Sequence, residues 1–194
     1  MHPSLLTLLV GFLYILGFNG LSYLRHQGLS GRFIAEGLII TGIGAALNLV
    51  IPFHPLLFLL ALYLLTMRVR LVIDLGNSVA ARGQPERALQ FYDLALRLGA
   101  DIFSRRVAEI NQGAALLQLG RAEEAYQILR PVVTDPGVRL GAKYQAAACY
   151  NLGLAARRTG REAEAVCRFN EAIDALPGSI YAYGARQALK KKDE

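Results

Sequence analysis

The side chains that could perform covalent or metal chemistry are few and far apart in this sequence. All three histidines, His2, His26 and His54, lie in the first 70 residues, whereas Cys149 and Cys167 lie near the C-terminal end. The two cysteines match no CxxC or zinc-ligand spacing, and we interpret them as small buried apolar side chains. Because the sequence contains no Ser/His/Asp set, phosphate-binding loop or metal cluster, we expect no enzyme activity, no cofactor and no metal ion.

The charged residues are distributed unevenly, which separates the chain into two parts. Residues 1–70 contain only five formal charges, and these are Arg25, Arg32, Glu36, Arg68 and Arg70. The remainder contains 17 basic and 14 acidic residues, and each part has a net charge of +3. In the second part the positive charge is spread over a mixed surface, so we expect no nucleic-acid partner.

Two apolar blocks in the first part predict membrane spans. One block covers about 4–24, which is the length needed to cross a bilayer. The second covers 33–67 and is too long for one span, but Pro52 and Pro55 interrupt it and predict a tight turn. We therefore predict a transmembrane domain at 1–69 with spans at about 4–24, 33–51 and 55–75. A re-entrant hairpin is the alternative for 55–67, because only about 13 residues precede Arg68.

The arginines indicate how these spans are oriented. Arg25 and Arg32 lie between the first two spans, and Arg68 and Arg70 follow the start of the third. With three spans all four lie on one side, which the positive-inside rule assigns to the cytoplasm. The prediction is a multi-pass protein of a cell (inner or cytoplasmic) membrane, with its N-terminus outside and the region after residue 70 in the cytoplasm.

The second span contains small residues one helical turn apart. Gly37, Thr41 and Ala45 form one row, and Gly42 and Ala46 form the row beside it. Small side chains let helices approach closely, so we predict helix packing at this face. The other helix belongs either to this chain or to a membrane partner. Glu36, which lies one turn from Arg32, is expected to pair with it at the headgroup level.

The second part repeats one pattern three times. Each copy has a Gly, an Ala twelve positions later, a large residue four further and a small residue three beyond that. The copies are Gly76/Ala88/Tyr92/Ala95, Gly113/Ala125/Leu129/Val132 and Gly153/Ala165/Phe169/Ala172. A second Gly follows seven residues after the first in each copy, at Gly83, Gly120 and Gly160. Periods of about 37 and 40 residues predict a stack of helix pairs, and such stacks are usually binding surfaces.

These residues resemble the tetratricopeptide repeat family. The resemblance is strongest over 149–177, which reads CYNLGLAARRTGREAEAVCRFNEAIDALP. It implies a helical solenoid at 70–178, and with the predicted transmembrane helices before it the fold is expected to be all-α. The three repeats cover about 69–102, 106–139 and 146–178, followed by a capping helix and basic tail at 179–194. From Pro55 to Ala81 only Gly76 could break a helix, so we predict one continuous helix from the membrane into the repeats.

The family resemblance also implies a concave groove that receives a peptide or helix. Its positions correspond here to Asn77, Asn111, Asn151, Tyr150, Leu154, Arg157 and Arg158. An Asn amide both donates and accepts, so it can pair with a ligand's backbone; solvated polar side chains are the alternative interpretation. Some members hold a C-terminal carboxylate with Lys and Arg, but Ile73 and Ala147 occupy two of those positions, and Arg157 and Arg158 would have to supply the charge.

Two functions fit these features. The first is a membrane-anchored scaffold or assembly factor that binds a peptide or helix of a client membrane protein complex. The second is a permanent accessory subunit of a larger membrane complex, energy-transducing or transport. Both imply a protein partner and a lipid bilayer, and the sequence leaves the oligomeric state open.

Overall fold

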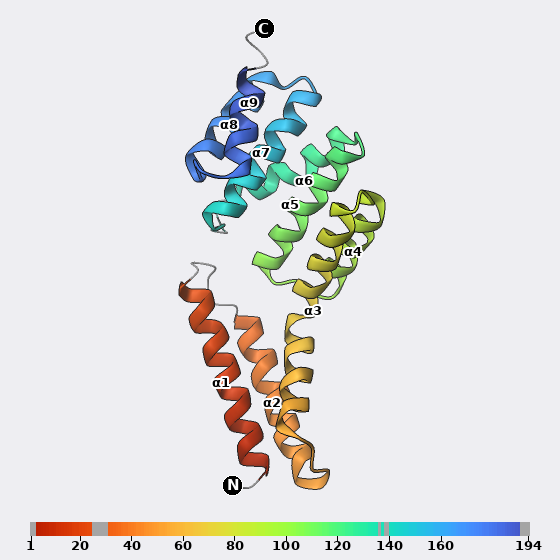
Figure 1. Ribbon diagram of the computed structural model, residues 1–194, viewed down its shortest axis with the longest axis vertical. Coiled ribbons are helices and arrows are strands. Elements are labelled where there is room, and N and C mark those ends of the chain that lie inside the picture. The colour runs from red at the N-terminus through yellow and green to blue at the C-terminus, as the bar shows by residue number, and fades with distance from the viewer. Residues whose placement is uncertain (1–2, 25–30, 136, 138–139, 191–194) are drawn as a thin grey trace. The chain divides into compact units, whose positions relative to one another are not determined.

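The computed structural model describes residues 3–24, 31–135, 137 and 140–190, and it divides into two compact units at residues 1–69 and 70–194. All regular secondary structure in the described residues is helical, which confirms the predicted all-α fold (Figure 1). The helices are α1 (Pro3–Leu24), α2 (Gly31–Val50), α3 (Pro55–Ala81), α4 (Pro85–Arg97), α5 (Ile102–Gln118), α6 (Ala122–Thr134), α7 (Ala142–Arg158), α8 (Glu162–Ala175) and α9 (Ile180–Lys190). His2, Arg25, His26 and residues 191–194 of the predicted capping helix and basic tail lie outside the described residues.

Three helices are long and apolar enough to cross a membrane. By length and composition these are Pro3–Tyr23, Gly31–Val50 and Pro55–Ala81. The turn between the last two contains Pro52, and Pro55 occupies the first position of α3, where its missing N–H costs no hydrogen bond. The outer faces of these helices carry large exposed apolar side chains such as Leu13 and Ile39.

Close contacts at glycine hold the N-terminal unit together. A Cβ added at Gly11 would lie 2.3 Å from the Thr41 Oγ1 atom, and one at Gly37 would lie 2.9 Å from the Ile15 side chain. Thr41 and Gly37 are buried, so this row of small residues packs α2 against α1. Gly42 and Ala46 are exposed, which leaves the second row uncovered among the described residues.

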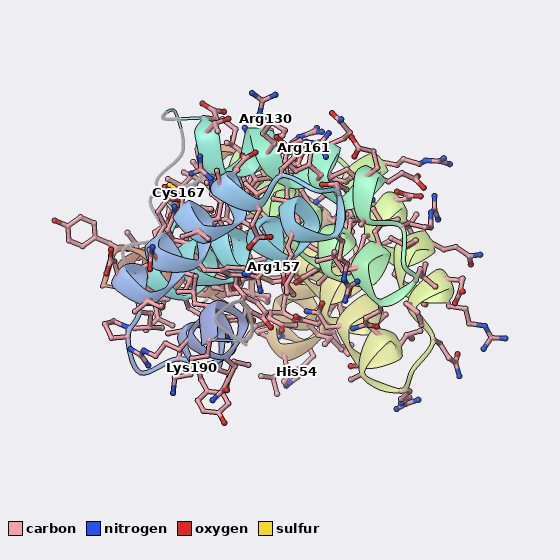
Figure 2. All side chains as sticks on the ribbon, turned by 90° about the horizontal axis from the view of Figure 1, so that it is seen from above. His54, Arg130, Arg157, Arg161, Cys167 and Lys190 are labelled. Carbon is pink, nitrogen blue, oxygen red and sulfur yellow. The ribbon has the colours of Figure 1, made fainter. Side chains whose placement is uncertain are left out.

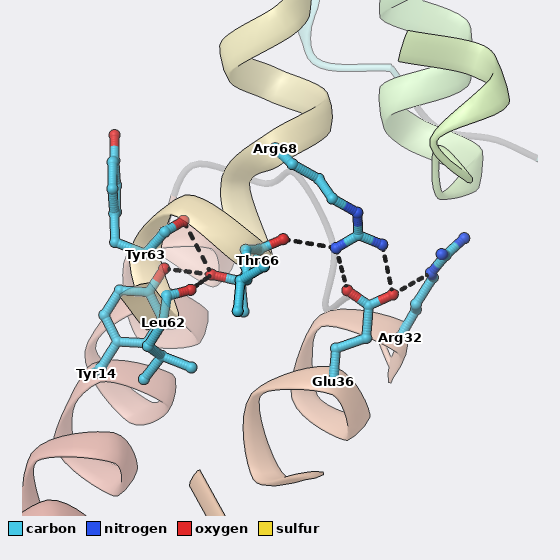
Figure 3. Close-up of polar contacts among 8 residues, drawn as sticks. Tyr14, Arg32, Glu36, Leu62, Tyr63, Thr66 and Arg68 are labelled. Atoms are coloured by element: carbon cyan, nitrogen blue, oxygen red, sulfur yellow. Dashed lines mark hydrogen bonds and ion pairs between the residues drawn. The ribbon is translucent and has the colours of Figure 1, made fainter. Parts of the chain in front are cut away.

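Few polar side chains lie inside the N-terminal unit, and most of them are paired. The Arg68 guanidinium donates through Nη1 and Nη2 to both oxygens of Glu36, at 2.7 and 2.9 Å (Figure 3). The Arg32 Nε donates to the same carboxylate at 2.7 Å, as the sequence predicted. The sequence did not predict the contribution of Arg68, which joins α3 to α2. The Asn48 amide donates to the Thr7 Oγ1 at 2.7 Å and connects α2 to α1.

The spacing of the repeat pattern has a direct structural reason in the second unit. A Cβ added at Gly76, Gly113 or Gly153 would lie 2.6, 2.5 or 2.7 Å from a large side chain sixteen residues later. Those side chains are Tyr92, Leu129 and Phe169, each at most 1% exposed. Glycine on the first helix therefore leaves space for the large side chain that packs against it from the second helix of each pair.

The turns between paired helices require glycine for a different reason. Gly83, Gly120 and Gly160 have φ angles of +75°, +76° and +79°, a region that side chains with a Cβ rarely adopt. The N–H that follows each glycine reaches back to a carbonyl of the preceding helix, as Arg161 does to Ala156 at 2.8 Å. This hydrogen bond satisfies a helix end that would otherwise lack partners.

Candidate functional site

The first helices of successive pairs form one side of the repeat unit. Helix α5 contacts α7, and α7 contacts α9, whereas α4, α6 and α8 make no such contacts with one another in the described residues. The array is therefore tighter on the side of the first helices. We call this side the inner surface; it comprises α5, α7, α9 and residues 70–81 of α3.

The three predicted groove asparagines differ in what they contact. Asn77 is exposed on α3, and its Oδ1 accepts a hydrogen bond of 2.9 Å from the Tyr92 hydroxyl. The Asn111 side chain on α5 is half-buried, and Asn151 on α7 is only 7% exposed. Neither of these two amides has a hydrogen-bond partner within the described parts of the chain. The donors and acceptors of both amides are therefore available to a ligand.

The two predicted groove arginines are bound to the chain itself. The Arg157 Nη1 donates to the Ala188 carbonyl at 2.6 Å, and its guanidinium lies 4.7 Å from the centroid of the Phe169 ring. The Arg158 Nη1 donates to the Leu117 carbonyl at 2.5 Å. Figure 2 shows Arg157 among the helices of the array, while Arg130 extends outward from α6. In this structure the arginines join helix ends, so little of their charge is available to a guest.

Tyr150 and Leu154, the other two predicted groove residues on α7, also contribute to the packing of the repeats. Both lie against the core cluster to which α5, α6, α7, α8 and α9 contribute. The Tyr150 ring centroid lies 6.1 Å from those of Phe169 and Tyr181, which connects α7 to α8 and α9. Tyr150 therefore supports the inner surface as much as it contributes to it.

The repeat geometry agrees with a comparison against known families. The family model described as tetratrico peptide repeat matches residues 72–187, more than half of the chain. The chain belongs to the tetratrico peptide repeat family. Repeats of this family are in general protein-interaction modules without catalytic activity. No curated protein matched the chain.

The tetratrico peptide repeats contain a pocket that the sequence did not predict. It has a volume of about 140 Å³ and lies between the N-terminal parts of α5 and α7 and residues 70–74 of α3. Its lining consists of Arg70, Ile73, Asp74, Phe103, Ser104, Val107 and Tyr144. Phe103 and Tyr144 precede the recurring positions of their repeats, so the repeat pattern gave no signal for them.

Phe103 and Tyr144 form an aromatic wall of this pocket, and their rings contact each other. The Phe103 and Tyr144 rings meet edge to face with centroids 5.5 Å apart, a favourable arrangement for two rings. Tyr181 lies near Tyr144, and burial, with a smaller contribution from Tyr144, raises the pKa of the Tyr181 hydroxyl. The Tyr181 hydroxyl is therefore neutral at physiological pH.

The cysteines have different environments. Cys149 is fully buried, as predicted, and burial raises the pKa of its thiol to about 12, so the thiol is unreactive at neutral pH. The prediction was wrong for Cys167, which is exposed on α8 (Figure 2) because it lies on the outer face of that helix. Across the described residues no group of three His, Cys, Asp or Glu side chains could hold a metal ion.

Proposed function

We propose that this protein is a membrane-anchored scaffold or assembly factor whose inner surface binds a peptide or helix of a client membrane protein complex. Helices α1 and α2 and the first part of α3 would anchor it in a cytoplasmic membrane. The N-terminus would lie outside and the repeats in the cytoplasm. The position of Arg32, Arg68 and Arg70 supports this orientation, because these residues flank the apolar segments on one side.

The observation that carries the proposal is the Asn151 side chain. It is more than nine-tenths buried, yet its amide has no partner in the described parts of the chain. Ile110 and Ala147 are buried beside the same inner surface, together with the half-buried Tyr144. An amide that can donate and accept, set among apolar side chains, suits the backbone of a bound segment whose side chains are apolar.

The uncovered row on α2 favours a second function, that of a permanent accessory subunit. Gly42 and Ala46 are exposed between large exposed side chains such as Ile43 and Leu47. Such a face would suit continuous contact with a neighbouring membrane helix. The two functions differ in stoichiometry: a subunit stays at a fixed ratio in the mature complex, whereas an assembly factor is released from it.

Affinity capture of the full chain from detergent-solubilised membranes tests the groove. With the double variant Asn111→Ala/Asn151→Ala, we expect the recovered amount of a co-purifying protein to fall roughly tenfold or more, because two hydrogen bonds to it are removed. Asn170→Ala is the matched control, because Asn170 is an exposed asparagine on the outer helix α8. Equal recovery of every co-purifying protein with both variants would refute the proposal that this groove binds a partner.

Reporter fusions test the membrane topology separately. Fusions at residues 1, 53 and 194 should report outside, outside and cytoplasm, respectively. A cytoplasmic signal at residue 53 would contradict three spans and would favour the re-entrant hairpin.

A further inference from the structure

The pocket on the inner surface has apolar walls and a size that suits one side chain. Ile73 and Val107 are 3% and 9% exposed and form its apolar part together with the Phe103 and Tyr144 rings. A volume of about 140 Å³ is enough for one long side chain but not for a folded element. The pocket therefore has the size and the apolar lining to accept a single side chain.

The polar groups of the pocket define the charge of that residue. Asp74 is exposed on α3, and its carboxylate forms no ion pair or hydrogen bond with any described residue. The Ser104 side chain is only 7% exposed, and its hydroxyl likewise has no partner in the described residues. An unpaired carboxylate and an unpaired hydroxyl can both accept hydrogen bonds from a cation.

The aromatic wall adds to the preference for a cation. Ring faces attract guanidinium and ammonium groups, and the chain already uses this attraction: the Arg70 guanidinium carbon lies 5.8 Å from the Phe103 centroid. Arg70 repels a second cation, but it lies on the Phe103 side of the pocket. Asp74 is one helical turn further along α3.

We propose that this pocket binds the side chain of a lysine or arginine in the segment that the groove receives. This inference rests on the proposed function. The aliphatic stem of the guest would lie against Ile73 and Val107, and its cationic end would pair with Asp74 and the Ser104 hydroxyl. Lysine and arginine are suited to such a site because they combine a long apolar stem with a charged end.

A client membrane protein would supply this residue from a predictable place. Cytoplasmic segments next to membrane spans are enriched in lysine and arginine. Asp74 itself lies at the C-terminal end of the predicted third span. The partner class is therefore a membrane protein with a basic cytoplasmic segment beside one of its spans.

A positional-scanning library of synthetic peptides tests the proposal with the full chain in detergent micelles. Each pool fixes one position as Lys, Arg, norleucine or Glu; norleucine retains the stem of Lys and lacks its charge. We expect wild-type protein to retain Lys and Arg pools above norleucine and Glu pools. Asp74→Asn should lower retention of the Lys pool about fivefold, and Asp74→Glu should preserve it.

The Arg70→Gln variant also tests which charge the pocket prefers, because it removes a positive charge instead of a negative one. Removing this cation should raise retention of the Lys pool while Asp74→Asn lowers it. The reverse pattern, in which Glu pools are preferred and Arg70→Gln weakens them, would overturn the proposal in favour of an anionic guest. Norleucine retained as well as Lys would also overturn it, by showing that the pocket takes an apolar residue. Circular dichroism of each variant checks that the helices are intact.

The groove and the pocket can fail separately in this experiment. If peptides bind and Asn111→Ala/Asn151→Ala releases them while Asp74→Asn leaves basic pools unchanged, the groove stands and the pocket proposal is wrong. If wild-type protein retains no pool above empty micelles, the groove proposal is refuted, and the pocket proposal with it.

Discussion

The two units of this protein pack helices with the same device in different settings. In both, a glycine lets a larger side chain approach: Thr41 meets Gly11 in the N-terminal unit, and Leu129 meets Gly113 in the repeats. In water the buried apolar area drives the repeats together. In the proposed membrane setting lipid is as apolar as the helices, so contact and hydrogen bonding must hold the first unit.

The polar side chains follow the same division. The N-terminal unit directs its few polar groups inward, as in the Glu36–Arg68 pair and the Asn48–Thr7 hydrogen bond. The repeats place charged pairs on the surface, as in the ion pair between Arg161 and Glu123, although Asn151 and Ser104 are buried. The comparison predicts how each unit should respond to mutation.

The largest effect is expected from the core of the repeats. Phe169 is fully buried in the third helix pair, so Phe169→Ala should lower the free energy of unfolding of the array by about 3–5 kcal/mol. Urea denaturation of the detergent-solubilised full chain, followed by circular dichroism, measures it. Tyr183→Ala is the control, because that ring is 64% exposed and should change stability by less than about 0.5 kcal/mol.

A pH-dependent effect is expected at alkaline pH in the repeats. Burial raises the pKa of the Tyr92 hydroxyl from 10.0 to about 12, so the folded state keeps a proton that the unfolded state loses. The contribution of Tyr92 to stability is therefore complete below about pH 10 and should fall on the order of 2 kcal/mol as the pH rises towards 12. Urea denaturation at a series of pH values should show a smaller fall for Tyr92→Phe. An identical fall in both proteins would contradict the assignment.

The same substitution in each unit compares the two packing devices directly. Gly113→Ala and Gly11→Ala each place a Cβ within 2.5 Å of a neighbouring side chain, and each should cost about 1–3 kcal/mol. Gly17→Ala is the control, since nothing lies within 4 Å of that position and alanine favours the helix. Urea denaturation reports on the repeats and titration with SDS on the N-terminal unit. If Gly11→Ala lowers the stability of the N-terminal unit no more than Gly17→Ala does, the packing of α1 against α2 does not depend on this close contact.

The smallest effect concerns the ion pairs of the N-terminal unit. Glu36→Gln removes the carboxylate that joins Arg68 to Arg32 and should destabilise this unit by about 1–2 kcal/mol. Arg32→Gln should cost less, because the Arg32 side chain is 45% exposed and Arg68 keeps its partner. SDS titration of the full chain measures both. Equal losses would indicate that Arg68 contributes nothing beyond a surface charge.

Much of the fold could be predicted because its determinants are local or periodic. The recurring Gly, Ala and aromatic residues predicted the all-α array and its family, which the structure and the family match confirm. Long apolar stretches and two prolines predicted the three candidate spans. Helix period and chain length are sufficient for such inferences.

The site could be predicted only in part, because it depends on contacts between distant residues. The pairing of Arg68 with Glu36 joins positions 32 residues apart, and periodicity cannot choose such a partner. The capping roles of Arg157 and Arg158 depend on carbonyls of other helices. The pocket requires Phe103 and Tyr144, which lie outside the repeated positions and meet only when α5 packs on α7.

The core behind the inner surface is built largely from alanine. Fully buried alanines of the repeats are Ala88, Ala95, Ala108, Ala125, Ala146, Ala148, Ala155, Ala156, Ala165, Ala172, Ala182 and Ala185. Alanine has no side-chain torsion, so these residues lose no rotamer entropy on folding and have no alternative rotamers to adopt afterwards. A segment bound in the proposed groove would therefore meet a surface whose support is already fixed, and the ordering entropy of binding would fall mainly on that segment.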